Sequence, residues 1–105
     1  MMYTSANSED ANALFDALLS MENRDEIQRF LADLCTPSEI EAMVQRYLVA
    51  RMLRDGKTGS EIVRRTGSST ATISRVNRSL RYGHQGYELA LVREENERER
   101  NDGPE

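Results

Sequence analysis

The segment at about residues 58–82 constrains the fold of this chain most, because it places a glycine between two helix-start signals. Thr58 and Glu61 have the spacing of a capping box, in which each side chain accepts a hydrogen bond from the other residue's backbone amide. The two serines that follow Gly67 offer a second helix start. Two short helices that cross at a tight, glycine-bearing turn are typical of a helix-turn-helix. The sequence therefore predicts a helix-turn-helix in this segment.

Amphipathic helices are predicted for most of the remaining chain, whose 105 residues suit a single domain. Apolar residues recur at intervals of three and four over residues 11–19 and 27–34, which is the pattern of a helix with one buried face. A last short helix is expected over residues 87–93. The expected organisation is a flexible tail at 1–10, an all-α domain at 11–93 and a charged tail at 94–105.

The third expected helix has the clearest start. Thr36 is a suitable cap, Pro37 suits the first helical position, and Glu39 can complete a capping box. This helix is expected to continue to about Asp55. Its middle, residues 47–53 apart from one arginine, is apolar on nearly every side, so we expect it to be buried on every side. In so short a chain a second copy is the simplest cover, which predicts a homodimer.

The composition excludes several classes of protein. No apolar run approaches the roughly 20 residues needed to span a bilayer, and residues 1–10 lack the basic start and apolar centre of a secretory signal. We therefore expect a cytoplasmic protein with no membrane partner. With one cysteine (Cys35) and one histidine (His84), the chain offers no internal disulfide, no full set of metal ligands and no set of nucleophile, base and orienting group. No enzyme activity, metal or cofactor is expected.

Charge is strongly segregated along the chain, although the net charge is only −4. Residues 36–87 carry nine basic and four acidic side chains. Residues 1–35 carry seven acidic and two basic side chains, and residues 88–105 carry seven acidic and three basic ones. A basic middle between acidic ends favours a polyanionic partner for the middle. Ordinary scatter of charge over solvated helix surfaces is the alternative.

The second helix of the predicted pair has an apolar and a polar face. Ile73, Val76 and Leu80 form the apolar face, and Ile62 and Val63 of the first helix can pack against it. Short and cationic side chains share the opposite face: Thr70, Ala71, Ser74, Arg75 and Arg78. Short side chains let a helix enter the major groove of DNA, where hydroxyl, methyl and guanidinium groups contact base edges. The alternative is that the serines and threonines serve only as caps and surface.

Cations around this helix can contact DNA phosphates, which gives salt-dependent affinity without sequence information. The cations of this segment are Lys57, Arg64, Arg65, Arg75, Arg78 and Arg81, opposed only by Glu61. Ser60, near a helix N-terminus, lies where backbone amides could also bind a phosphate. The segment is therefore interpreted as a DNA-binding surface.

Several motifs resemble those of the Trp repressor superfamily. They are Thr36-Pro37-Ser38-Glu39, Gln45-Arg46 and, above all, Thr70-Ala71-Thr72-Ile73-Ser74-Arg75. The similarity to its YerC/YecD-like branch is carried by residues 34–36, 49–58 and 70–83. The resemblance as a whole covers about residues 11–92. It implies an intertwined, six-helix homodimer that acts in transcription.

The resemblance also implies which residues contact DNA. These are Ser60, Ser69, Thr70, Ala71, Thr72, Ser74 and Arg81. Val63 stands where the Trp repressor has a basic contact residue, and the neighbouring Arg64 could take over that contact.

An effector pocket is a further implication of the resemblance. The Trp repressor binds tryptophan as its corepressor, and Thr36, Arg46, Arg75 and Ser79 match the positions of that pocket. Val76, however, stands where a glycine leaves room for the indole ring. We therefore expect no tryptophan binding, and the sequence names no other small-molecule effector. Arg46 and Arg75 are then interpreted as structural or phosphate-contacting cations.

Together these features predict a sequence-specific transcriptional regulator, expected to be a repressor, whose partners are double-stranded DNA and a second copy of itself. Such a homodimer would bind a near-palindromic operator, with its two reading helices about 34 Å apart. A helical adaptor that uses the same fold to dock another protein is the alternative.

Overall fold

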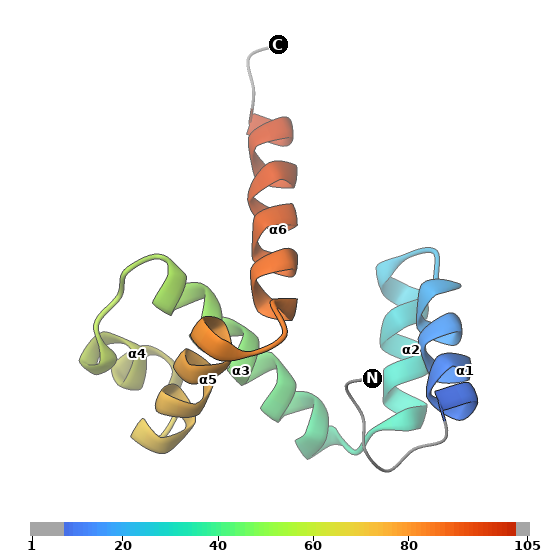
Figure 1. Ribbon diagram of the computed structural model, residues 1–105, viewed down its shortest axis with the longest axis horizontal. Helices are drawn as coiled ribbons and strands as arrows, with labels where there is room; N and C mark the ends of the chain where they lie inside the picture. Colours follow the sequence, from blue (N-terminus) through green and yellow to red (C-terminus); the bar gives the residue numbers. More distant parts are fainter. Residues whose placement is uncertain (1–7, 103–105) are drawn as a thin grey trace. The chain divides into compact units, whose positions relative to one another are not determined.

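The computed structural model describes residues 8–102, and every regular element in that range is a helix. Figure 1 shows the six helices, which are α1 (Ser8–Leu19), α2 (Arg24–Leu34), α3 (Pro37–Arg54), α4 (Gly59–Thr66), α5 (Thr70–Tyr82) and α6 (Gly86–Asp102). The predicted all-α class is confirmed. Over the described range, no helix combines the length and the apolar character needed to cross a membrane.

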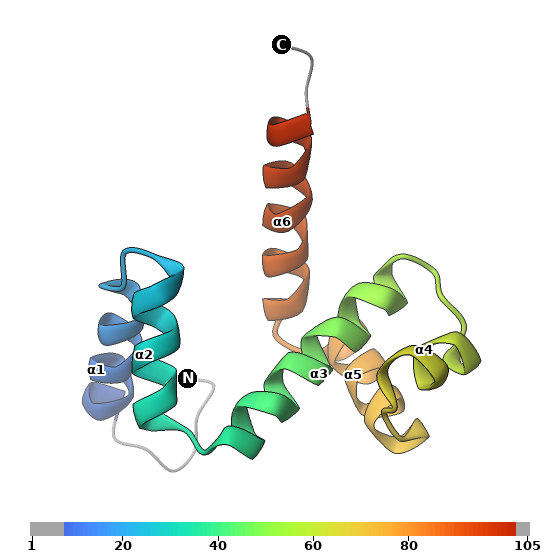
Figure 2. The same ribbon diagram turned by 180° about the vertical axis from the view of Figure 1, so that it is seen from behind.

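The chain divides into two compact units, residues 1–40 and 41–105, with the division inside α3. In the first unit, α1 and α2 are joined by a short connection (Figure 2). Asn23 caps α2, because its side-chain oxygen accepts a hydrogen bond of 2.9 Å from the amide of Glu26. No residue of α1 or α2 is buried, and the side chains of Leu19 and Leu34 are 82% and 51% exposed.

The start of α3 follows the predicted capping box. The amide of Glu39 donates to Thr36 Oγ1 at 3.2 Å, and the amide of Thr36 donates to Glu39 Oε1 at 2.8 Å. These hydrogen bonds from Thr36 hold the pKa of the Glu39 carboxyl below its ordinary value. The predicted helix start at Pro37 is confirmed.

The second unit has a small core to which α3, α4, α5 and α6 all contribute. Its buried residues are Val49, Ala50, Ile62, Ile73, Val76 and Leu91. The chain's own helices bury Val49 and Ala50 in the middle of α3, whereas the other apolar residues of this stretch are half-buried, so the expectation that it is buried on every side is met only in part. A second copy as the cover for the rest stays a prediction. Val63 was predicted to pack against α5 but is exposed, because the adjacent Ile62 takes the inward position on α4.

The last helix is longer than the sequence predicted. It was expected to end near Arg93 and to give way to a charged tail, whereas α6 continues to Asp102. Glu94 and Glu95 lie inside the helix, where each forms an ion pair with an arginine of α3. The expected N-terminal tail is likewise shorter, since α1 begins at Ser8. The rest of both predicted tails, residues 1–7 and 103–105, lies outside the described residues.

Candidate nucleic-acid interface

The first helix of the predicted helix-turn-helix, α4, begins at a complete capping box. The amide of Glu61 donates to Thr58 Oγ1, and the amide of Thr58 donates to Glu61 Oε1, both at 3.2 Å. The pKa of the Glu61 carboxyl is lowered by these hydrogen bonds from Thr58, since they favour its charged form. This arrangement fixes the position at which α4 starts, next to the exposed side chains of Lys57 and Ser60.

The turn between the two helices contains the glycine that the sequence predicted. Gly67 has a φ of 72°, a left-handed conformation that costs a glycine little, and its amide donates to the carbonyl of Val63 at 2.8 Å. The end of α4 is also attached to α3, because Gln45 Nε2 donates to the carbonyl of Thr66 at 2.9 Å. The turn is thus fixed by its own backbone and by a side chain from α3.

The second helix, α5, is capped by Ser69, whose hydroxyl accepts a hydrogen bond of 3.1 Å from the amide of Thr72. Its inner face carries Ile73 and Val76, both buried, and Leu80, which packs against the core. Its outer face is exposed and carries Thr70, Ala71, Ser74, Arg75, Arg78 and Arg81. The predicted division of α5 into an apolar and a polar face is confirmed.

The structure gathers the predicted DNA-binding residues on one helix pair. Lys57 precedes α4, Ser60 and Arg64 lie on α4, and the remaining candidates cap or lie on α5, which packs directly against α4. All are exposed except Thr72, which is half-buried beside its cap. Among the described residues, none of the five candidate cations (Lys57, Arg64, Arg75, Arg78 and Arg81) forms an ion pair. Glu61 interacts electrostatically with Lys57 and Arg64, but no carboxylate of the described residues pairs directly with any of the five.

The sequence motifs predicted this arrangement, in which a glycine turn leads into a helix with one apolar and one polar face. The family model of the Trp repressor protein matches residues 9–95. The chain belongs to the Trp repressor family.

Similar proteins place the chain within this family of regulatory DNA-binding proteins. The uncharacterized protein YerC of Bacillus subtilis (strain 168) is 47% identical over 93 residues, which is 89% of each chain. A candidate Trp repressor from Staphylococcus aureus, known from a crystal structure, is 43% identical with a TM-score of 0.85, and the match covers 90% of this chain and 95% of that one. A TrpR-like protein from Eubacterium eligens ATCC 27750 is 48% identical with a TM-score of 0.79, over 81% and 88% of the two chains. The predicted resemblance to the YerC-like branch is confirmed.

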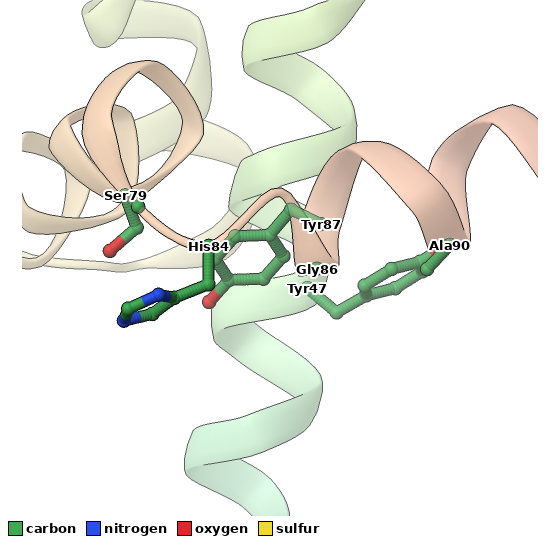
Figure 3. A pocket seen from close by; sticks show the side chains of 7 residues that line it. Tyr47, Ser79, His84, Gly86, Tyr87 and Ala90 are labelled. Carbon is green, nitrogen blue, oxygen red and sulfur yellow. The ribbon is translucent and has the colours of Figure 1, made fainter. Parts of the chain in front are cut away.

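The four residues that match the effector pocket of the Trp repressor have different surroundings in the described part of the chain. Ser79 lines a cavity of about 400 Å³ together with Tyr47 of α3 and Tyr87 of α6 (Figure 3). Arg46 and Arg75 are exposed and do not contribute to the lining of this cavity. Thr36 belongs to the first unit, where it caps α3.

Val76, the residue that replaces a glycine of the Trp repressor, is only 2% exposed. Its side chain is part of the core formed by α3, α4, α5 and α6. The structure therefore places the Val76 side chain in the interior of the second unit.

A polar network between α3 and α6 was not predicted from the sequence. Tyr47 Oη donates to Glu94 Oε2 at 2.6 Å, and Arg51 Nη1 donates to Glu94 Oε1 at 2.7 Å. Arg54 forms ion pairs with Glu88 and with Glu95. The sequence feature that could have indicated the network is the spacing of the three α3 residues, which are four and three positions apart and so share one helix face. This network attaches α6 to the helix against which the helix-turn-helix packs.

Proposed function

We propose that this member of the Trp repressor family is a sequence-specific transcriptional repressor that binds a near-palindromic operator as a homodimer. The outer face of α5 carries the proposal: it is exposed, its cations are unpaired within the described chain, and its opposite face is anchored in the core. A helix anchored on one side can present the other side to the major groove in a fixed register.

The two ends of the outer face suit different parts of DNA. Thr70, Ala71 and Ser74 are short and lie in the first turns of α5, so the backbone there can approach base edges closely. Arg75 is placed to reach a guanine or a phosphate, because its guanidinium group can form two parallel hydrogen bonds. Lys57, Ser60, Arg64, Ser69, Thr72, Arg78 and Arg81 complete the surface, chiefly as phosphate contacts.

The homodimer is supported by the apolar side chains that the single chain leaves exposed. On α1 and α2 these are Leu14, Leu18, Leu19, Ile27 and Leu34. Two amphipathic helices without a buried residue need a partner surface, and a second copy of the same chain supplies one with matching character. Two copies related by a two-fold axis would present two reading helices to successive major grooves.

The function is tested by selecting binding sites from random DNA duplexes and measuring the affinity of the selected site by fluorescence anisotropy. We expect a two-fold related site, an affinity that falls steeply with salt, and about tenfold weaker binding for Arg75→Ala. Replacement of Thr70 or Ala71 is expected to change the preferred sequence. Arg93→Ala is the matched control, because it removes an exposed arginine of α6 that forms no ion pair with the described residues.

Unchanged binding by the Arg75, Thr70 and Ala71 variants would overturn the assignment of the DNA-binding face. Equal affinity for selected and random duplexes would favour the helical adaptor, which needs no preferred sequence.

We further propose that repression does not require tryptophan. The side chain of Val76 fills the position at which a glycine would admit an indole ring. Calorimetric titration with L-tryptophan is expected to show no binding, and DNA affinity is expected to be the same with and without it. Micromolar binding of L-tryptophan would contradict this prediction.

A further inference from the structure

A second cavity, of about 310 Å³, lies within the second unit and is distinct from the cavity that Ser79 lines. Residues of α3, α4, α6 and the connection between α3 and α4 contribute to its walls. We propose that this cavity binds a small organic phosphate, that is, a phosphomonoester on a compact apolar body.

The charged lining of the cavity favours an anion. Arg51, Lys57, Arg65 and Arg98 all line it, opposed by Asp55 alone. Glu94 forms an ion pair with Arg51. Arg98 interacts electrostatically with Glu94 and Glu95, and Lys57 with Glu61, but within the described chain Lys57, Arg65 and Arg98 form no ion pair. Guanidinium groups match the oxygens of a phosphate with paired hydrogen bonds, so two unpaired arginines and a lysine suit a dianion better than a single negative charge.

The remaining walls specify the rest of the ligand. Leu48 and Met52 lie on α3 and give the cavity an apolar side. Its volume is at the lower end of the range for small-molecule sites, which fits a ligand of the size of a phosphorylated ring rather than a nucleotide. Apolar contacts together with cations would select an organic phosphate over inorganic phosphate.

The extension of α6 completes this cavity. Arg98 lies five residues beyond the position at which the sequence predicted that the helix would end. The ion pairs of Arg51 with Glu94 and of Arg54 with Glu95 hold this part of α6 against α3. One of the four lining cations, Arg98, is therefore supplied by a helix that ion pairs attach to α3.

Occupancy of the cavity would alter DNA binding, a consequence that rests on the proposed function. Lys57 both lines the cavity and belongs to the proposed DNA surface, so a bound phosphate would compete for its charge. Thr66 also lines the cavity, and it directly precedes Gly67 of the helix-turn-helix turn. We expect the ligand to weaken operator binding severalfold, because one phosphate contact of each chain is lost.

The site is tested by NMR titration of the full-length protein, in the absence of DNA, with phenyl phosphate as the probe and phenol as its uncharged counterpart. We expect phenyl phosphate to cause saturable shifts of the Lys57 and Thr66 amide signals and phenol to cause none. Arg65→Gln and Arg98→Gln are each expected to weaken binding about tenfold, since each removes a charge-assisted contact. Arg93→Gln removes an arginine of α6 that lies outside the cavity and forms no ion pair within residues 8–102, and it is expected to bind like the wild type.

Three results would overturn the proposal: no saturable shift with phenyl phosphate, equal binding of phenol, or equal weakening by Arg93→Gln. The amide spectra of the variants report whether each is folded, and Lys57→Gln provides a further lining variant if one is not. Operator affinity is measured separately, so a protein that binds the operator but not phenyl phosphate loses only this site. If the protein binds phenyl phosphate but no operator, the cavity is a binding site and the proposed function is wrong.

Discussion

Two adjacent serines in the turn of the helix-turn-helix have opposite roles. Ser69 caps α5 through its hydroxyl, whereas Ser68 is 3% exposed and its hydroxyl has no hydrogen-bond partner among the described residues. A cap satisfies a backbone amide that has no partner within the helix, while a buried hydroxyl without a partner loses its hydrogen bonds to water. The same residue type therefore stabilises the fold at one position and destabilises it at the next.

Substitution of each serine by alanine is expected to change stability in opposite directions. Ser69→Ala should lower the free energy of unfolding by about 1 kcal/mol, because the amide of Thr72 loses its partner. Ser68→Ala should raise it by up to about 1 kcal/mol, because an unsatisfied buried hydroxyl is removed. Urea denaturation followed by circular dichroism, at one protein concentration, measures both. A loss of stability in both variants would show that the Ser68 hydroxyl has a partner in solution.

Caps and the turn glycine were predictable because they depend on local sequence. Thr58, Glu61, Gly67 and Ser69 all occupy the roles that their spacing predicted. The direction of Val63 was not predictable in the same way. Two consecutive apolar residues on a helix point about 100° apart, so only one of them can face α5. Packing against the core determines whether Ile62 or Val63 takes that position.

At the scale of elements, the contact between α3 and α6 determines how far the last helix extends. Burial, followed by the hydrogen bond to Glu94, raises the pKa of Tyr47 to about 12. Hydrogen bonds from Tyr47 and Arg51 lower the pKa of Glu94, and the hydrogen bond from Arg54 lowers that of Glu95. These partners lie more than 40 residues apart in the sequence. A prediction based on neighbouring residues therefore ended the helix too early.

The Tyr47–Glu94 contact is expected to make stability fall at both ends of the pH range. The folded pKa of Glu94 lies below 4.5, so its contribution is present above that pH and is lost as the pH falls. The folded pKa of Tyr47 lies above the ordinary 10.0, so its contribution is present below pH 10 and is lost as the pH rises through about 12. The contact therefore stabilises the fold most between these limits.

The variant Tyr47→Phe tests this contact, because it keeps the ring and removes the hydroxyl. We expect the free energy of unfolding to be lower by about 1 kcal/mol near neutral pH. We also expect residue 47 to contribute nothing to the loss of stability at alkaline pH, and the loss of stability at acid pH to be smaller. The urea midpoint, measured from pH 3 to pH 12, gives all three values. Tyr82→Phe is the control, since Tyr82 is 79% exposed. A profile for Tyr47→Phe that runs parallel to the wild type would contradict the assignment.

At the scale of the whole molecule, the structure shows that some cations of the basic middle segment are paired with carboxylates of α6. The basic middle of the sequence holds nine cations, but Arg51 and Arg54 are bound by carboxylates of α6. The cations left unpaired are concentrated on α4, α5 and the connection before them. The excess of basic residues in the middle of the chain could be read from the sequence. The number of cations without an ion pair among the described residues required the structure, because pairing depends on tertiary contacts.

Assembly is tested by substitutions on the exposed apolar side of the first unit. Leu19→Glu combined with Leu34→Glu is expected to convert a dimer into a monomer and to reduce operator affinity, because two charges would enter the proposed interface. Asn12→Glu combined with Gln28→Glu adds the same charges at exposed polar positions of the same helices. Sedimentation equilibrium gives the mass of each variant. A dimer that survives the leucine variant would place the interface elsewhere.

The first unit has a consequence for folding as well as for assembly. Between residues 8 and 40 no side chain is buried, so this part of the described chain has no interior of its own. Isolated helices of 11 or 12 residues are marginal in water, and their helicity must come from whatever they dock against. Dilution should therefore melt these two helices while the helix-turn-helix stays folded, so that the amount of protein in solution governs how much of the chain is ordered.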